Sequence, residues 1–209
     1  QACGIRGIRL AYASTSEVYG DNGEAVCDEY EGPFTLPHNL YGISKWFGEK
    51  VCEHFAPEGL VIFRFSMPYG PGLPAGWGRA AIVNMLHQAL HGKRIPVHRG
   101  AERSWCYVTD TVRATRLALE LDEGGIYNVG RDDAARSMRY VAEHACSLTG
   151  ADEKLIQEID PPKMQTVVKR LATERIRALG WEPEIELEEG MERTLEWVKT
   201  LDAQGALAA

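Results

Sequence analysis

The stretch NLYGISKWFGEKVCEHFAPEGLVIFRF, residues 39–65, decides the fold, because it predicts one helix followed by one buried strand. Its helical part carries an apolar stripe at a spacing of four residues, made of Ile43, Phe47, Val51 and Phe55, with Trp46 beside it. Such a stripe is typical of a core or a dimer interface. Pro57 and Gly59 end the helix, and residues 60–65 form the near-continuous apolar run of a parallel strand buried on both faces.

A second strand precedes this helix. Residues 8–13 (IRLAYA) form a short apolar run that leads into the polar segment STSEVYG at 14–20. The segment SMPYGPG at 66–72 follows the strand at 60–65 in the same way. The order strand, loop, helix, strand, loop predicts an α/β protein with a doubly wound parallel sheet. Open sheets of this kind bind ligands at the carboxyl ends of their strands, although a turn rich in Ser and Thr is the simpler interpretation of 14–20.

Further helices are predicted at residues 79–91, 137–150, 173–179 and 187–201, together with one that Asp110 caps. Ser137 caps the second of these, and Gly150 ends it. His87 and His91 are spaced like two metal ligands, but a zinc-protease helix has glutamate at the position of Gln88. We interpret both histidines as helix-surface residues and expect no metal site.

Composition excludes several classes of protein. A net charge of −7 argues against a surface for nucleic acid or for an anionic membrane. The apolar runs are shorter than the roughly 20 residues that span a bilayer, and the first residues do not resemble a secretory signal. The five cysteines lack CxxC spacing, which favours reduced thiols in a cytoplasmic protein over disulfides or a zinc site.

Tyr41 and Lys45 are candidates for acid–base chemistry. They are four residues apart, so a helix places both side chains on one face. A neighbouring ammonium stabilises a phenolate, which makes tyrosine a better base at neutral pH. The spacing alone is also compatible with an ordinary exposed helix face.

Six stretches in one order give the chain a resemblance to a known family. They are STSEVYG at 14–20, YGISK at 41–45, YGPG at 69–72, RSWCYVTD at 103–110, YNVG at 127–130 and LGWEP at 179–183. Together they resemble the extended short-chain dehydrogenases/reductases, in particular the NAD-dependent epimerases and dehydratases of nucleotide sugars. The resemblance implies the C-terminal part of a Rossmann-like sheet plus a small mixed α/β substrate-binding domain.

The resemblance also implies roles for the matching residues. Tyr41 would take the proton of a sugar hydroxyl while hydride leaves the same carbon for NAD. Lys45 would hold the nicotinamide ribose, with Ser14 as a further cofactor contact. Thr15 would bind the reacting hydroxyl, and Arg103 the diphosphate, for which a fork of donors is well suited. Tyr69 and Met67 match further substrate contacts of the family. For Arg103, the alternative to a role in binding diphosphate is an ordinary surface arginine.

Three departures from the family pattern stand out. The Gly-rich turn that cradles the NAD pyrophosphate has no counterpart, so the resemblance covers about the C-terminal two thirds of a family member. We therefore expect the chain to be part of a longer protein. Residues 1–66 are expected in the Rossmann-like domain and residues 67–209 mostly in the substrate domain. Residues near 100–130 are expected to return to the Rossmann-like domain. Met67 replaces a substrate-binding asparagine, and a proline near residues 160–162 replaces a diphosphate-binding arginine.

Glu17 bears on which reaction the family resemblance implies. Epimerases need no base beyond the tyrosine, whereas dehydratases and sugar-acid decarboxylases use a glutamate at this position beside the new carbonyl. Because similar sequences occur in epimerases, we expect a nucleotide-sugar epimerase, with 4,6-dehydratase or decarboxylase as the alternative. A non-catalytic fragment without the NAD site is a further alternative. The family resemblance implies a homodimer for the complete protein.

Overall fold

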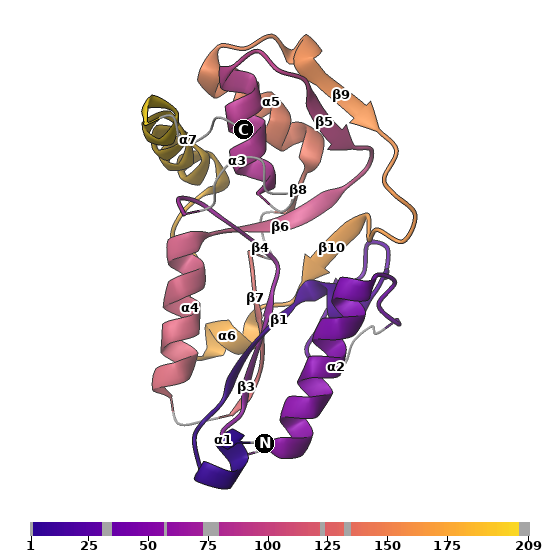
Figure 1. Ribbon diagram of the computed structural model, residues 1–209, viewed down its shortest axis with the longest axis vertical. Helices are drawn as coiled ribbons and strands as arrows, with labels where there is room; N and C mark the ends of the chain where they lie inside the picture. Colours follow the sequence, from indigo (N-terminus) through magenta and orange to yellow (C-terminus); the bar gives the residue numbers. More distant parts are fainter. Residues whose placement is uncertain are drawn as a thin grey trace.

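The structure is a computed structural model that describes residues 2–30, 35–56, 58–72, 80–121, 124–131 and 135–204 (Figure 1). The expected helix end at Pro57 and helix start at Arg79 lie outside the described residues. The helices are α1 (Ala2–Arg6), α2 (Leu40–Phe55), α3 (Ala81–Leu90), α4 (Val108–Glu120), α5 (Met138–Thr149), α6 (Glu174–Ala178) and α7 (Leu187–Ala203), with 3-10 turns η1 (Ser16–Tyr19) and η2 (Glu153–Leu155). The strands are β1 (Ala11–Thr15), β2 (Val26–Cys27), β3 (Val61–Phe65), β4 (Met67–Tyr69), β5 (Ile95–His98), β6 (Glu102–Tyr107), β7 (Gly125–Val129), β8 (Ala135–Ser137), β9 (Ile156–Ile159) and β10 (Val168–Leu171).

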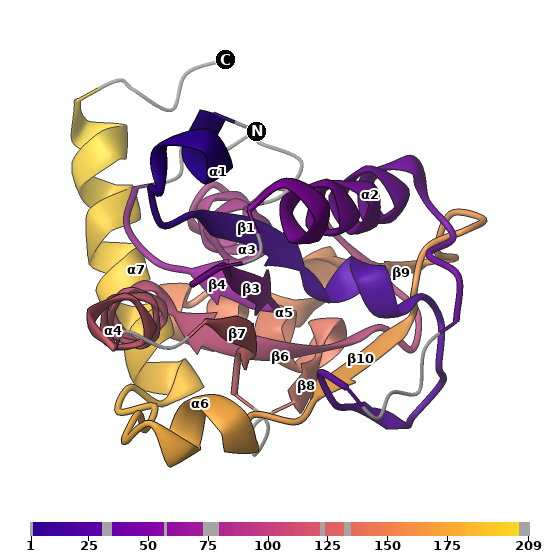
Figure 2. The ribbon, with the colours of Figure 1, turned by 90° about the horizontal axis from the view of Figure 1, so that it is seen from below.

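A parallel sheet in the order β1-β3-β7 confirms the predicted α/β class. Its central strand β3 pairs with β1 from Ala11↔Val61 to Thr15↔Phe65 and with β7 on its other side. Helices α2 and α4 lie on opposite sides of this sheet (Figures 1 and 2). Val61, Ile62 and Phe63 are buried, because helices cover both faces of the strand.

Strand β1 is displaced from the expected position. The prediction placed it at residues 8–13, but it spans Ala11–Thr15, and Ile8 is 52% exposed. Among the described residues β1 pairs only with β3, so its first residues lie at a sheet edge. Burial begins only at Ser14 and Thr15, and the Ser14 hydroxyl contacts the buried Glu49 of α2.

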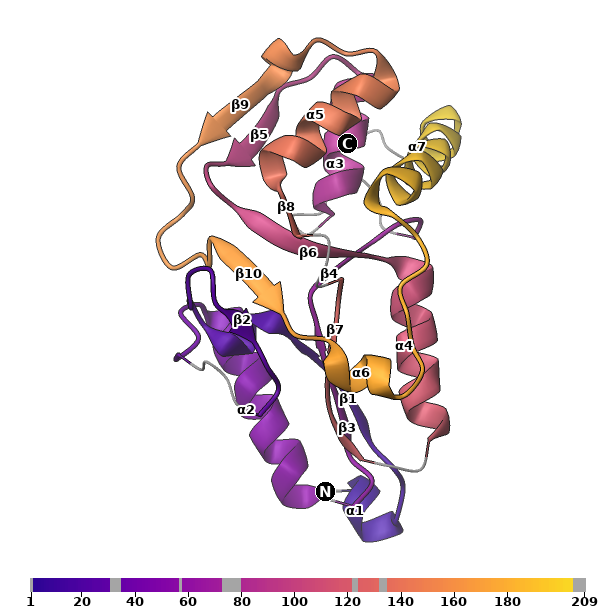
Figure 3. The same cartoon turned by 180° about the vertical axis from the view of Figure 1, so that it is seen from behind.

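A second set of strands is centred on β6. It pairs in parallel with β4 and β10 and antiparallel with β8, while β5 pairs with β9 (Figure 3). Helices α3, α5 and α7 pack against one another beyond β6 (Figures 1 and 3). Their shared core includes the fully buried side chains of Leu86, Val141, Met191 and Val198. This part is the small mixed α/β unit that the sequence predicted.

Helix ends follow local side-chain chemistry in most places. The Asn39 side chain accepts a hydrogen bond from the Gly42 amide (2.8 Å) at the start of α2, and Ser137 caps α5, which ends at the left-handed Gly150 (φ 71°). The predicted cap at Asp110 is wrong, because α4 begins at Val108. The Asp110 carboxylate instead accepts from the amides of Glu184 and Ile185 (3.1 and 3.0 Å) and holds the segment before α7.

The apolar stripe of α2 faces away from the sheet. Ile43, Phe47, Val51 and Phe55 are 43%, 65%, 38% and 43% exposed. Gly42 and Glu49 are the buried residues of the helix, so its contact face is polar and small rather than apolar. The core alternative for the stripe is thereby wrong for the isolated chain. No helix in the described part is both long and apolar enough to cross a bilayer.

Candidate active site

A cleft of about 750 Å³ opens where β1 and β3 end and β6 and β10 pass across them. Its lining includes seven of the predicted site residues: Ser14, Thr15, Glu17, Tyr41, Lys45, Met67 and Arg103. These residues come from β1, η1, α2, β4 and β6. The cleft therefore lies at the carboxyl ends of parallel strands, as an open α/β sheet requires.

Tyr41 and Lys45 lie at the start of α2 and share one face of it. The Lys45 Nζ is 5.9 Å from the centre of the Tyr41 ring and donates a hydrogen bond to the Ala13 carbonyl (2.7 Å). That bond ties the lysine to β1. An ammonium has three N–H donors, so Lys45 can bind a ligand as well as Ala13.

Glycine lets α2 approach this close. A Cβ on Gly42 would lie 2.9 Å from the Glu17 carbonyl oxygen, and one on Gly48 would lie 2.0 Å from the Tyr12 hydroxyl. Both distances are too short for any side chain. The helix carrying Tyr41 thus packs directly on the loop carrying Glu17.

Ser14 and Thr15 end β1 on the wall of the cleft. Thr15 caps η1, and its Oγ1 accepts from the Glu17 amide (3.3 Å). The Ser14 hydroxyl donates to the Glu49 carboxylate, which forms a buried ion pair with Arg64 (2.8 Å). Ser14 therefore has a structural partner in α2, in addition to its predicted place beside a cofactor.

Glu17 has a partner that the sequence analysis did not predict. Its carboxylate forms an ion pair with Lys169 and accepts from Asn39 Nδ2 (3.0 Å) and Thr166 Oγ1 (3.3 Å). The Lys169 side chain is 8% exposed. Burial lowers the pKa of Lys169 to about 7. One signal was present: alternation along β10 places Lys169 on the same face as the buried Leu171.

Arg103 is a wall residue of the cleft, so the surface alternative is wrong. It is 5% exposed and stands opposite Lys169 in the parallel pairing of β6 with β10. Its guanidinium donates to the carbonyls of Glu102, Thr166 and Val167 at 2.6–2.9 Å. Burial lowers the pKa of Arg103 to about 10. A phosphate ligand would therefore have to share these donors with the backbone.

Met67 and Tyr69 both belong to β4 but lie in different surroundings. Met67 lines the cleft, whereas Tyr69 is not among the lining residues and is 5% exposed. The Tyr69 ring packs edge-on against Trp105 and Tyr107, and its hydroxyl donates to the Leu187 carbonyl (3.2 Å). The structure thus places Tyr69 in the core, away from the predicted substrate contact.

Comparison with known proteins identifies the family. The model of the NAD dependent epimerase/dehydratase family matches residues 1–130, which is more than half of the 209-residue chain. The chain therefore belongs to this family.

Several characterised proteins and solved structures are similar to it. A trifunctional UDP-glucose 4,6-dehydratase/3,5-epimerase/reductase of Arabidopsis thaliana is 30% identical over 207 residues, covering 94% of this chain and 30% of that protein. A UDP-N-acetyl-alpha-D-glucosaminuronate decarboxylase of Bacillus cytotoxicus is 26% identical, covering 93% and 64%. A UDP-glucose 4-epimerase of Thermus thermophilus, solved with NAD, has a TM-score of 0.84 at 25% identity, covering 95% and 66%. The chain thus spans between about a third and two thirds of these relatives.

Proposed function

We propose that the complete protein is an NAD-dependent epimerase of nucleotide sugars that works through a transient keto sugar. The observation that carries the proposal is the cleft in which Tyr41, Lys45 and Thr15 converge. A phenol, an ammonium and a hydroxyl suit the oxidation of an alcohol, because that step must remove a proton from oxygen. The same groups fit NAD, since Lys45 can donate to ribose hydroxyls while it remains bonded to Ala13.

In the proposed first step, Thr15 positions the reacting hydroxyl of the sugar and Tyr41 takes its proton. Lys45 stabilises the phenolate form of Tyr41 by its positive charge. The chemistry supplied by bound NAD is the acceptance and return of a hydride at the same carbon. Between the two hydride transfers the keto sugar would turn and present its other face, and return of the proton from Tyr41 to the sugar oxygen completes the inversion. Arg103 is proposed to bind the diphosphate, with Met67 beside the sugar.

A dehydratase or decarboxylase is the second candidate, and the position of Glu17 favours it. Glu17 lines the cleft two residues after Thr15, and its carboxylate forms an ion pair with Lys169. A carboxylate there can remove a proton from the carbon next to a new carbonyl. The relatives include both a 4,6-dehydratase activity and a decarboxylase.

Mass spectrometry of products from a panel of nucleotide sugars distinguishes these reactions. With the complete protein, we expect products of unchanged mass and altered sugar configuration. A product lighter by one water would replace the epimerase proposal with a dehydratase. A product lighter by one carbon dioxide would replace it with a decarboxylase. Calorimetric titration of the 209-residue chain with NAD tests the remaining alternative, because a non-catalytic fragment should give no binding heat.

We propose that residues 1–66 belong to the cofactor domain and residues 67–209 mostly to the substrate domain. Two separate apolar clusters support this division. One surrounds Leu86, Val141 and Met191, and the other joins Phe63 and Val129 of the sheet to Ala114 of α4. The second cluster also explains why residues near 100–130 return to the sheet.

We further propose that the complete protein forms a homodimer through α2. The exposed stripe centred on Phe47 supports this, because an isolated apolar helix face is typical of an interface. Sedimentation of the complete protein should show a dimer, and Phe47→Ser should shift it toward monomer. An unchanged dimer in Phe47→Ser would remove α2 from the interface.

A further inference from the structure

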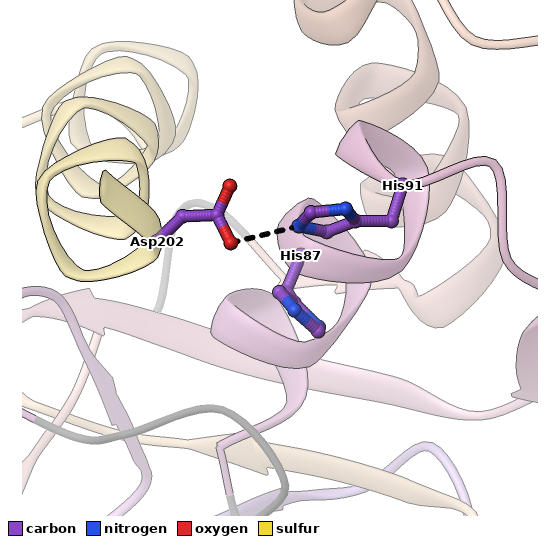
Figure 4. Close-up of side chains that lie close together, drawn as sticks. All are labelled: His87, His91 and Asp202. Carbon is purple, nitrogen blue, oxygen red and sulfur yellow. Dashed lines mark hydrogen bonds and ion pairs between the residues drawn. The ribbon is translucent and has the colours of Figure 1, made fainter. Parts of the chain in front are cut away.

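Three side chains with metal-binding atoms converge where the last turns of α3 and α7 meet (Figure 4). His87 and His91 lie one turn apart on α3 and at its C-terminal cap, and Asp202 lies in the last turn of α7. The His91 Nε2 is 3.1 Å from the Asp202 Oδ1, and the two imidazole rings are 4.6 Å apart between centres. One candidate ligand atom from each residue lies within 4.8 Å of the other two.

Two imidazoles and one carboxylate form a ligand set that suits Zn²⁺ and other divalent transition metals. In a tetrahedral zinc site with bonds of about 2.1 Å, donor atoms are separated by about 3.4 Å. The His91–Asp202 distance already matches this separation. The other donor atoms reach this separation by rotation of the side chains. Those of His91 and Asp202 are free to rotate, because they are 34% and 38% exposed.

The Asp202 carboxylate supplies the negative charge of the candidate site. Lys93 is the cation that disfavours metal binding, and the Asp202 carboxylate offsets it.

From the sequence we expected no metal site at His87 and His91, but the sequence could not place Asp202 beside them. We propose that His87, His91 and Asp202 bind a divalent transition-metal ion, with Zn²⁺ as the preferred ion, and thereby fasten the end of α7 to α3. None of the three lines the active-site cleft, so the site is separate from the proposed reaction. Helix α7 already packs on α3 in the shared core that includes Leu195 and Val198, and the metal adds a link at its last turn. Three protein ligands leave the fourth position of a tetrahedral site for water.

The simpler interpretation is an ion pair between His91 and Asp202 alone. The two interpretations differ in what they require of His87. An ion pair needs only His91 and Asp202, acts without metal, and contributes little to stability at this exposure. A metal site needs all three residues and stabilises the protein only when the metal is present.

Metal titration of the 209-residue chain tests the proposal. After treatment with a chelator, the wild type and the variants His87→Ala, His91→Ala and Asp202→Asn are titrated with Zn²⁺ by calorimetry. We expect one equivalent to bind the wild type and at least about tenfold weaker binding in each variant. The exposed His54 of α2 supplies the matched control, and His54→Ala should bind like the wild type. Zn²⁺ should raise the melting temperature of the wild type and of His54→Ala only.

Co²⁺ identifies the ligands, because the five free cysteines are competing donors. Weak visible bands without sulfur-to-cobalt charge transfer are expected for nitrogen and oxygen ligands. Melting in chelator shows whether each variant is folded, and His87→Gln replaces His87→Ala if the latter is not. Unchanged zinc affinity in the His87 variant, a thiolate spectrum, or absence of zinc binding by the wild type would overturn the proposal.

Discussion

Replacing Glu49 by glutamine should destabilise the protein strongly, because this residue anchors the helix that carries Tyr41 and Lys45. The Glu49 side chain is fully buried and Arg64 is 4% exposed, and the two are joined at 2.8 and 3.1 Å. Burial alone lowers the pKa of Arg64, but the bonds to Glu49 raise it above its ordinary value, so the guanidinium stays charged. Removing one partner of a buried pair costs about 3–5 kcal/mol. In a chain of this length that corresponds to a melting temperature lowered by roughly 6–20 °C.

Urea denaturation followed by circular dichroism measures the free energy of unfolding. The same helix offers a matched control, since the Lys50–Glu53 pair is 47% and 36% exposed. Glu53→Gln should change stability by less than about 1 kcal/mol. The double variant Glu49→Leu/Arg64→Met should be more stable than Glu49→Gln, because no unpaired charge remains buried. A Glu49→Gln protein within about 1 kcal/mol of wild type would refute the reasoning.

Three further predictions concern single side chains. Tyr41→Phe should abolish turnover by the complete protein while leaving its circular dichroism unchanged; activity near that of wild type would remove Tyr41 from its proposed role. Lys169→Met should leave turnover by the proposed epimerase within a few fold of wild type, because only the dehydratase and decarboxylase candidates use the Glu17 carboxylate as a base; a loss of turnover of about tenfold or more would favour those candidates over the epimerase. Glu29→Gln should stabilise the protein at pH 7. Burial raises the pKa of Glu29, and its Oε2 has no hydrogen-bond partner among the described residues. The folded state then binds this proton more tightly than the unfolded state, so the contribution of Glu29 to stability falls as pH rises above about 4.5. Urea denaturation at pH 4 and pH 7 should show that Glu29→Gln raises the free energy of unfolding only at pH 7. An equal effect at both pH values would contradict the raised pKa of Glu29.

Local sequence patterns predicted much of the framework. The apolar run of β3 and the cap at Ser137 depend on neighbours in the chain, so their positions could be predicted. Asp110 has the chemistry of a cap but bonds to amides more than 70 residues away. Spacing cannot reveal such a partner. The stripe on α2 was recognised, but spacing alone did not distinguish a core from an exposed face.

The candidate site was likewise predictable only where its residues belong to short local motifs. Thr15, Tyr41 and Lys45 belong to short motifs, and the structure brings them into one cleft. Lys169 approaches Glu17 only through the pairing of β10 with β6 and is separated from it by most of the chain. Tyr69 lies within a matching motif, yet its ring packs in the core against Trp105 and Tyr107.

The register that places Arg103 opposite Lys169 has an electrostatic consequence. Glu17 offsets the charge of Lys169, and Arg103 and Lys45 leave the cleft with a positive charge in a protein whose net charge is −7. At physiological ionic strength charges act over about 8 Å, so an approaching anion meets the acidic surface first and these cations only at the cleft itself. Selection of an anionic ligand would therefore take place at the cleft wall, and attraction from a distance would contribute little.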